Sequence, residues 1–317
     1  MGGKVWSILG KVSLIAGIVL SIQPLAKTEA ATTFSAAELA KLPIHVLVDA
    51  HRVNFPDVQP VIKNETTMIP LRFVTQSLGG KLSLQGKNIT IVKDKKVVKL
   101  TIGSNTATVN GKTLKLNVSS IAQDGRTLVP LRFVSEGLGE SVNWDSASKF
   151  VWIGSREVPK IEDETELESL NTYESFLKLN LSNFNGYGKP LTQARVITES
   201  DFPLNVGNQT IYRMDIVKNT LGEEYIRTIS DSKSIIGMSY FLYEQGQPEK
   251  IRSEIVGLRD KSDSNKSLRI SYIAIVDRAD RISLGLDNYD DMKIRNIDYL
   301  SFSLGRNDLV LMKNKFK

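Results

Sequence analysis

An internal repeat constrains the fold of this chain more than any other feature of its sequence. Residues 66–79 read TTMIPLRFVTQSLG, and residues 126–139 read RTLVPLRFVSEGLG, at a constant offset of 60 residues. Beyond them, Leu82 corresponds to Val142 at the same offset. Two related units of this size are the signature of a duplication, in which each unit is one small supersecondary structure. We therefore predict two copies of one unit side by side.

Each copy predicts a short helix packed on antiparallel strands. Pro70 suits the first helical position, and Gly79 suits the C-terminal cap. Between them Leu71, Val74 and Leu78 are spaced i, i+3, i+7, which gives the helix one apolar face. The same residue types recur 60 residues later, and short alternating runs flank both segments. The expected fold class is α+β, with a duplicated antiparallel sheet wrapped around a short helix.

The second copy carries the fuller pattern of motifs. A hairpin with the turn VNGK (residues 109–112) comes first, and Asn-Gly is the strongest short hairpin signal. The sequence RTLVPLRFVSEGLG follows, then VNWD (residues 142–145) and a closing strand. This pattern resembles the copper amine oxidase N-terminal domain, or stalk domain, over residues 44–154. The two copies would span about 44–103 and 104–154.

The resemblance implies an antiparallel sheet wrapped around a helix, in a secreted protein of a Gram-positive bacterium. It implies no chemistry, because in the oxidase this domain is remote from the active site. That enzyme needs three histidines around copper and a tyrosine in an Asn-Tyr-Asp context. The chain has only His45 and His51 and no cysteine, and Asn288-Tyr289-Asp290 matches the tyrosine motif over three residues alone. The remaining length is also too short for the oxidase domain. We expect no enzyme, metal or cofactor.

The first thirty residues are typical of a secretory signal peptide. Lys4 and Lys11 precede an apolar run at residues 12–20, and small residues lead to Ala30. The run is shorter than the ~20 apolar residues that span a bilayer, which favours cleavage at Ala30 over retention as an anchor. The expected location is extracellular, in association with the cell wall.

Charge divides the rest of the chain. Residues 41–156 hold sixteen basic and eight acidic residues, whereas residues 157–174 hold seven acidic residues and one lysine. The acidic stretch predicts a linker that leads into a helix near residues 164–181, followed by a second domain at residues 175–317. Its strand-like runs predict an α+β domain with a largely antiparallel sheet. These runs lie at residues 194–197, 211–217, 225–229, 235–243, 268–276, 281–286 and 309–312.

Six lysines are the candidate binding residues. Anionic wall polymers such as teichoic acids would be their partners, through screened electrostatics. The alternative is a solvated edge strand that lysines protect from aggregation. Nucleic acid is not expected, since no aromatic residues interleave with them. The six are Lys93, Lys95, Lys96, Lys99, Lys112 and Lys115.

One other polar cluster gives a weaker indication of a binding site. Asp260, Asp263, Asn265 and Ser267 offer calcium ligands, but their spacing departs from an EF-hand loop. The overall expectation is a secreted, non-catalytic module that acts as a spacer or interaction platform at the cell wall, with self-association through sheet edges. Two alternatives are a small-molecule or sugar-binding C-terminal domain and a wall-polymer hydrolase that uses a carboxylate pair.

Overall fold

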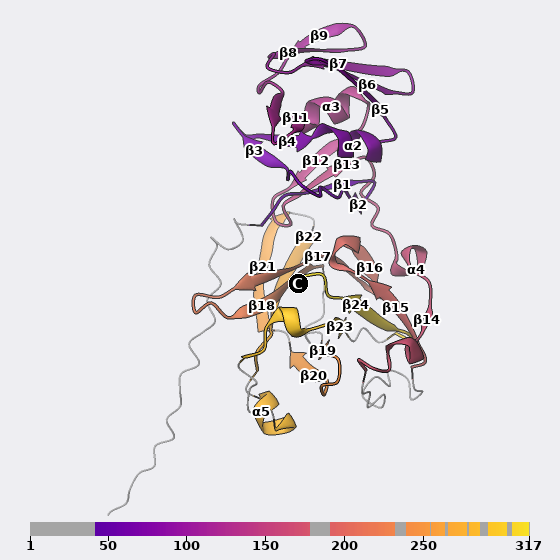
Figure 1. Ribbon diagram of the computed structural model, residues 1–317, viewed down its shortest axis with the longest axis vertical. Coiled ribbons are helices and arrows are strands. Elements are labelled where there is room, and N and C mark those ends of the chain that lie inside the picture. Colours follow the sequence, from indigo (N-terminus) through magenta and orange to yellow (C-terminus); the bar gives the residue numbers. More distant parts are fainter. Residues whose placement is uncertain are drawn as a thin grey trace, which may run out of the picture. The chain divides into compact units, whose positions relative to one another are not determined.

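A computed structural model shows two regions of mainly antiparallel β-structure, one before and one after the acidic stretch (Figure 1). The described residues all belong to one unit of the chain. Strands predominate and helices are few, in agreement with the expected α+β class. The structure describes residues 42–177, 191–231, 239–253, 255–263, 266–277, 279–285, 291–302 and 306–316.

The N-terminal region contains three small sheets. Their strand orders are β12-β13-β1-β2, β10-β11-β4-β3 and β5-β6-β7-β8-β9, and β1 runs parallel to β13. The first sheet comprises β1 (His45–Val48), β2 (His51–Arg52), β12 (Val142–Asp145) and β13 (Phe150–Ile153). The second comprises β3 (Val61–Lys63), β4 (Thr66–Pro70), β10 (Ile121–Gln123) and β11 (Arg126–Pro130). The third comprises β5 (Lys81–Gln85), β6 (Asn88–Lys93), β7 (Lys96–Thr101), β8 (Thr106–Val109) and β9 (Lys112–Lys115).

Two seven-residue helices lie among these sheets, as the sequence predicted. They are α2 (Leu71–Ser77) and α3 (Leu131–Gly137), and each follows a proline whose φ of about −60° suits a helix start. After each helix a glycine adopts a positive φ, +70° at Gly79 and +92° at Gly139, which ends the helix without steric penalty. Figure 1 shows both helices beneath the sheet β5–β9.

The strands that precede the two helices pair with each other in a symmetric register. Leu128 of β11 lies opposite Pro70 of β4, Val129 opposite Ile69, and Pro130 opposite Met68. Because these residues correspond at the offset of 60, the register maps onto itself when the two segments are exchanged. The burial pattern of the two strands is also the same, with the last three residues buried in each.

One apolar core holds the N-terminal region together. It contains the helix residues at the predicted spacing and the inward residues of all three sheets. Ile69 and Val129 come from the central strand pair, and Ile91 and Val98 from the β5–β9 sheet. Burial of these side chains, at roughly 25 cal/mol per Å² of apolar surface, compensates for the short length of the elements.

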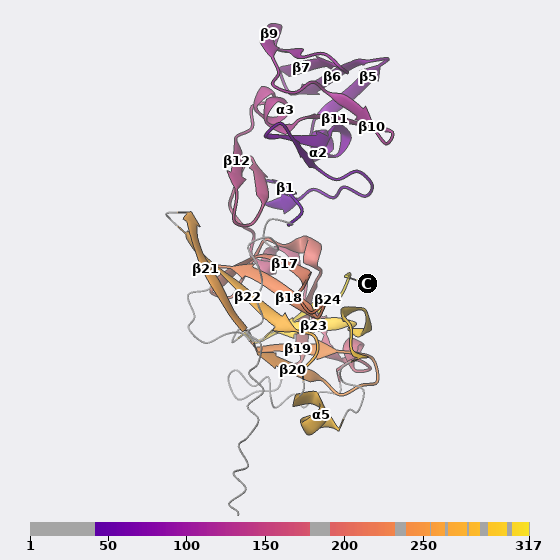
Figure 2. The same cartoon turned by 90° about the vertical axis from the view of Figure 1, so that its left-hand side faces the viewer.

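The C-terminal region consists of two sheets that pack face to face (Figure 2). One has the order β14-β15-β24-β23-β19-β20, with β15 and β24 parallel, and the other β16-β17-β18-β22-β21. The first sheet comprises β14 (Glu168–Ser169), β15 (Gln193–Ile197), β19 (Ser239–Tyr243), β20 (Lys250–Ser253), β23 (Tyr299–Phe302) and β24 (Leu309–Lys313). The second comprises β16 (Leu204–Val206), β17 (Gln209–Lys218), β18 (Glu224–Ser230), β21 (Ile255–Asp263) and β22 (Lys266–Ala274).

The core between these sheets draws on both of them. Leu242 and Met312 of the first sheet pack in one cluster with Ile226 and Ile273 of the second. A further cluster joins Trp152 of β13, in the N-terminal region, to aromatic residues of β17, β18 and β22. The second sheet is therefore covered on both faces, by the first sheet and by β1 and β13.

Two sequence expectations for the C-terminal region are wrong. The helix near residues 164–181 is replaced, through residue 177, by the one-turn helix α4 (Ile161–Glu164), β14 and a 3₁₀ turn at Leu170–Tyr173. The apolar residues at helical spacing there, among them Leu170 and Tyr173, instead cover the outer face of the first sheet. The run 281–286, expected as a strand, lies largely in the helix α5 (Ala279–Leu284). The other expected strands correspond to strands wherever they are described.

Candidate binding surface

The sheet β5–β9 carries all six lysines that the sequence singled out, on two different faces. Side chains alternate across a strand, so the buried Val98 and Leu100 mark the inner face of β7. Lys99, between them, points outward and is exposed. Lys96 shares the inner face with Val98. The six lysines therefore do not form a single cluster.

Two lysines of the inner face are engaged within the molecule. Lys93 forms an ion pair with Glu140, just after α3, and both side chains are about one-quarter exposed. The Lys96 ammonium lies against Gly139 at the C-terminal end of the same helix, where a Cβ would collide with it. A positive charge at that end is favourable, because helix carbonyls there lack partners. Lys93 and Lys96 thus secure the β6–β7 hairpin over α3.

A polar row crosses all five strands in register on the outward side of this sheet, on which Val92 and Val97 also lie. Ser83 pairs with Thr90, Thr90 with Lys99, Lys99 with Thr108, and Thr108 with Thr113. These five residues form one row from β5 to β9, in which Lys99 supplies the charge. We call this row with its neighbour Lys115 the outer face.

The remaining lysines are exposed. Lys115 lies opposite Thr106 and shares the side of β9 that carries Thr113, so it belongs to the outer face. Two strand spacings and two residues separate it from Lys99, about 12 Å. Lys112 is exposed on the other side of β9, and Lys95 is exposed in the β6–β7 turn. Of the six candidates, the structure brings only Lys99 and Lys115 to the outer face, whereas Lys93 and Lys96 lie opposite each other on the inner face.

A second charged group lies where the N-terminal region meets the C-terminal sheet. Arg213 of β17 is 2% exposed, and its Nη1 donates to the carbonyl oxygens of Pro43 at 2.9 Å and Ser148 at 3.2 Å. Its Nε lies 3.5 Å from a carboxylate oxygen of Asp215. Burial lowers the pKa of Arg213 to about 10, against the opposing attraction of Asp215.

His45 sits against this arginine. Its ring stacks on Phe150 with centroids 5.8 Å apart, and its Nε2 lies 3.4 Å from Nη2 of Arg213. Burial, together with the charges of Arg213 and Arg52, lowers the pKa of His45 to about 2. The imidazole is therefore neutral, with Nε2 as the acceptor, and suits packing rather than proton transfer at neutral pH. Sequence analysis missed Arg213, since nothing in its local pattern distinguishes it from a strand-surface arginine.

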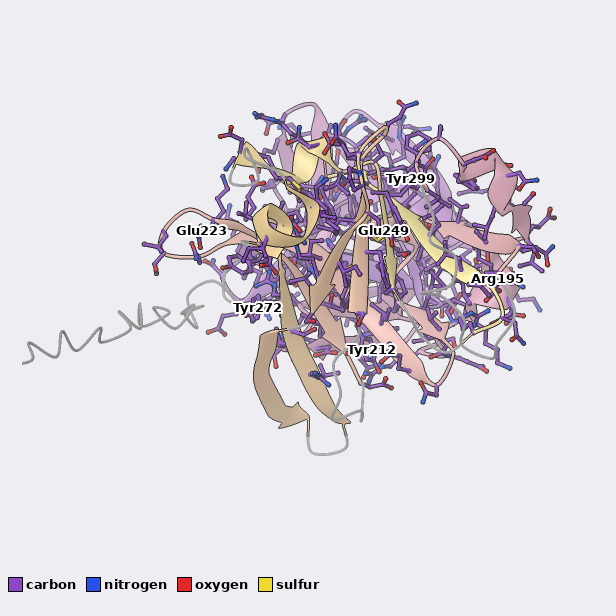
Figure 3. The ribbon with its side chains drawn as sticks, turned by 90° about the horizontal axis from the view of Figure 1, so that it is seen from below. Arg195, Tyr212, Glu223, Glu249, Tyr272 and Tyr299 are labelled. Carbon is purple, nitrogen blue, oxygen red and sulfur yellow. The ribbon has the colours of Figure 1, made fainter. Side chains whose placement is uncertain are left out.

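Several carboxylates of the C-terminal region are bound by arginines. Arg195, labelled in Figure 3, donates from Nε to Asp308 at 2.8 Å. Asp280 receives two hydrogen bonds from the buried Arg252, at 2.9 and 2.6 Å. A carboxylate whose oxygens are already bound by a guanidinium is poorly placed to act as a general acid. These contacts give the hydrolase alternative no support.

Other residues considered from the sequence lie apart from any site. Asp260 and Asp263 are in β21 and Ser267 is in β22, so a hairpin replaces the expected polar loop; Asn265 lies outside the described residues. Asn288-Tyr289-Asp290 also lies outside them. Among the described residues no cluster of three or more potential metal ligands occurs, and no helix has the length and apolarity to cross a membrane.

Comparison with known proteins bears on the N-terminal region alone. No curated protein matches the sequence. Residues 47–153 match the family described as copper amine oxidase N-terminal domain, a non-catalytic stalk-type domain. The match starts in β1 and ends with β13, so it spans all three sheets and both helices of this region. The resemblance predicted from the sequence is thereby confirmed: residues 47–153, a third of the chain, are recognised as a copper amine oxidase N-terminal domain.

Proposed function

We propose that this protein is a secreted, non-catalytic surface protein whose N-terminal domain is a spacer that contacts anionic cell-wall polymers. The proposal rests on the outer face of β5–β9, where Lys99 and Lys115 are exposed beside a row of polar side chains. The stalk-type family of residues 47–153 and the signal-like sequence at residues 1–30 support a structural role outside the cell.

The geometry of the outer face suits a repeating anionic chain better than a single small ligand. The sheet surface offers hydroxyl groups of Ser83, Thr90, Thr108 and Thr113 as hydrogen-bonding partners in one row across the strands. Ammonium groups attract phosphate or carboxylate as point charges, with little demand on orientation. Many weak contacts of this kind add up on a polymer, since each repeat presents the same group.

The proposal also includes an organisation for the chain. A signal peptide would end at Ala30, two copies of one unit would form the domain at residues 44–154, and a separate domain would occupy residues 175–317. The symmetric pairing of β4 with β11 supports a duplication, because each copy contributes the same residues to the contact. Trp152 packs in one apolar cluster with residues of the C-terminal sheet, which supports a spacer that is fixed to the second domain.

The test is co-sedimentation of the mature protein with purified Gram-positive cell walls across a salt series. The double variant Lys99→Gln, Lys115→Gln removes the two exposed charges of the outer face. We expect wild-type binding at low salt that falls steeply above ~0.15 M, where the Debye length shortens to ~8 Å. The variant should bind several-fold more weakly.

A matched control neutralises two other exposed lysines, Lys63 and Lys313, which lie outside the β5–β9 sheet. It changes net charge equally and should bind walls as the wild type does. Equal loss of binding in both double variants would show a general charge effect without a defined surface, and would overturn the proposal. Absence of wild-type binding at low salt would overturn the proposal.

A further inference from the structure

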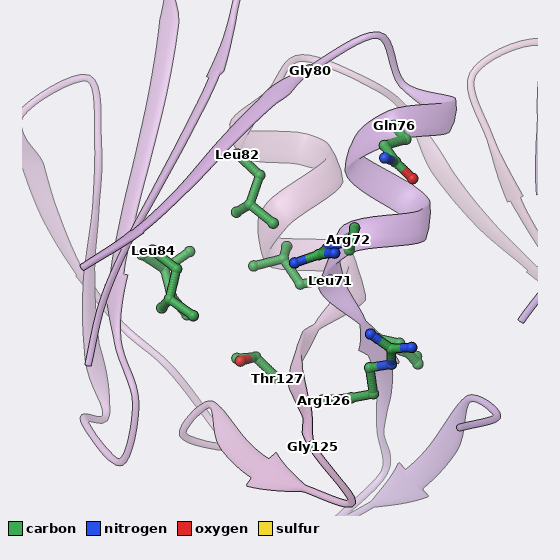
Figure 4. A pocket seen from close by; sticks show the side chains of 11 residues that line it. Leu71, Arg72, Gln76, Gly80, Leu82, Leu84, Gly125, Arg126 and Thr127 are labelled. Carbon is green, nitrogen blue, oxygen red and sulfur yellow. The ribbon is translucent and has the colours of Figure 1, made fainter. Parts of the chain in front are cut away.

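The N-terminal domain has a groove on a different side from the outer face, between α2, β5 and the β10–β11 hairpin. Its volume is about 620 Å³, within the range of ligand-binding pockets. Leu71, Leu82, Leu84 and Ile89 give it an apolar floor, and Leu84 is 53% exposed there. Arg72 and Arg126 stand over this floor (Figure 4). The groove therefore combines exposed apolar surface with two guanidinium groups.

Arg72 is available to a ligand, in contrast to its counterpart in the second copy. Arg132, 60 residues later, forms an ion pair with Glu136 one helical turn on, at 3.3 Å. In the first copy the residue at that position is Gln76, which also lines the groove, so the carboxylate is replaced by a neutral amide. Among the described residues no ion pair or hydrogen bond engages the Arg72 side chain. Figure 4 shows Arg72 extending from α2 toward the strand with Leu82 and Leu84.

Arg126 is held in place on the opposite wall. Its Nε donates to Asp57 at 2.8 Å, its Nη2 bonds the same carboxylate oxygen, and its guanidinium lies 5.5 Å from the centre of the Phe73 ring. These contacts fix the orientation of the Arg126 guanidinium plane. No described residue forms a hydrogen bond with its Nη1. Asp57 offsets part of the charge of Arg126, so Arg72 carries most of the attraction for an anion.

The strand beside the groove is an open sheet edge. β5 is the first strand of its sheet, and a two-residue turn at Gly86-Lys87 joins it to β6. In such a hairpin the residues that flank the turn exchange both backbone hydrogen bonds, and the pattern alternates along the strand. Gln85 and Ser83 therefore bond to β6, whereas the backbone groups of Leu82 and Leu84 face the open edge. An extended chain can pair with such an edge.

From these observations we infer that the groove binds an extended acidic peptide segment, which pairs with β5 and places alternate side chains, apolar and acidic, against the groove. The open backbone of Leu82 and Leu84 favours a peptide over a sugar, because only a peptide supplies a matching ladder of donors and acceptors. The carboxylates are required by the guanidinium of Arg72, which forms charge-assisted hydrogen bonds with them. This site is independent of the lysines of the outer face.

The probe is a blocked, fluorescein-labelled octapeptide in which serine alternates with glutamate and leucine in turn, so that both lie on one side of an extended strand. Binding to the mature protein is followed by fluorescence anisotropy. Three further ligands are tested: the same peptide with glutamine for glutamate, the same peptide with every backbone amide N-methylated, which blocks pairing in either strand direction, and alginate as an anionic polysaccharide. We expect only the first peptide to bind.

The variant Arg72→Gln should weaken binding about tenfold or more, which corresponds to the loss of a charge-assisted contact. Arg132→Gln is the matched control at the equivalent position and should leave binding unchanged. Both residues are exposed, so thermal unfolding should show both variants folded. Absence of binding by the acidic peptide, equal binding by the glutamine peptide or the N-methylated peptide, or equal loss in both variants would overturn the inference. Binding of alginate in place of the peptide would also overturn it.

Discussion

Arg213 donates from Nη2 to Nε2 of His45 across 3.4 Å, so a cation and a neutral imidazole meet where β17 contacts the start of β1. The contact requires the unprotonated ring, because an imidazolium has no acceptor. Two carbonyl oxygens, of Pro43 and Ser148, bind the other end of the guanidinium. This one side chain therefore connects three separate segments of the chain.

Acid should destabilise the protein through His45. Burial, Arg213 and Arg52 lower its folded pKa to about 2, against an ordinary value of 6.5. Between about pH 2 and pH 6.5 the unfolded chain therefore binds one more proton, at His45, than the folded chain. The contribution of His45 to the free energy of unfolding falls as the pH drops below 6.5, by up to ~1.4 kcal/mol per pH unit. Urea unfolding at pH 7 and pH 5 measures this. His45→Gln keeps an acceptor and does not titrate, so it should lose less stability than the wild type; an equal loss would contradict the prediction.

Replacement of Arg213 should be costly. Arg213→Met keeps the length of the side chain but leaves the carbonyls of Pro43 and Ser148 without their donor, and each unsatisfied buried group costs about 1–3 kcal/mol. We expect urea unfolding to show a loss of about 2–4 kcal/mol. Arg132→Met, which removes an exposed ion pair, is the control and should change stability by less than ~1 kcal/mol. A loss in Arg213→Met no larger than in this control would show that water replaces the guanidinium.

Local signals were sufficient to predict much of the N-terminal domain. Each helix lies between a proline and a glycine and has apolar residues at helical spacing, and the β8–β9 hairpin has an Asn-Gly turn. Each of these signals depends only on residues that are close together in the chain, so it can be read from the sequence. The sequence did not, however, predict which of the six lysines face outward and which face the inside of the domain. Strand parity and the position of α3 decide that Lys93 meets Glu140 while Lys99 faces outward, and both depend on tertiary packing.

The errors in the C-terminal region have a similar origin. Leu170 and Tyr173 are spaced as on a helix, yet they cover a sheet, because a 3₁₀ turn and a short strand can place the same apolar residues on one side. The pattern alone does not distinguish these structures. The groove near Arg72 also escaped prediction, since its walls come from residues about fifty positions apart. The one sign of it in the sequence is that Gln76 stands in α2 where Glu136 stands in α3, 60 residues later.

The helices α2 and α3 should respond differently to alanine at positions 60 residues apart. An ideal Cβ on Gly137 would lie 2.8 Å from Val98 Cγ2 and 3.1 Å from Val109 Cγ2, both on β-branched side chains with little freedom to turn. Overpacking of this kind costs about 1–3 kcal/mol, against a gain of ~1 kcal/mol in helix propensity. We expect Gly137→Ala to lower the free energy of unfolding by about 1 kcal/mol. Ser77→Ala, at the exposed equivalent, should change it by less than ~0.5 kcal/mol. Stabilisation by Gly137→Ala would contradict the close packing of α3 against β7 and β8.

His51 should titrate above its ordinary pKa, opposite to His45. Partial burial lowers the pKa of His51, but the hydrogen bonds to Glu164 and to the Asp49 carbonyl outweigh it. The ring nitrogens lie 2.8 Å from the Asp49 oxygen and 3.2 Å from the Glu164 carboxylate, and both partners only accept, so the imidazolium satisfies both contacts. The stabilisation of the folded state by protonated His51 is therefore complete below pH 6.5, and it is lost as the pH rises through the pKa of the folded state. NMR titration should place His51 above 6.5, and Glu164→Gln should lower its pKa. Because the ring is 60% exposed, the accompanying change in stability should be small. A pKa at or below 6.5 in the wild type would show that the α4 contact does not hold this side chain in solution.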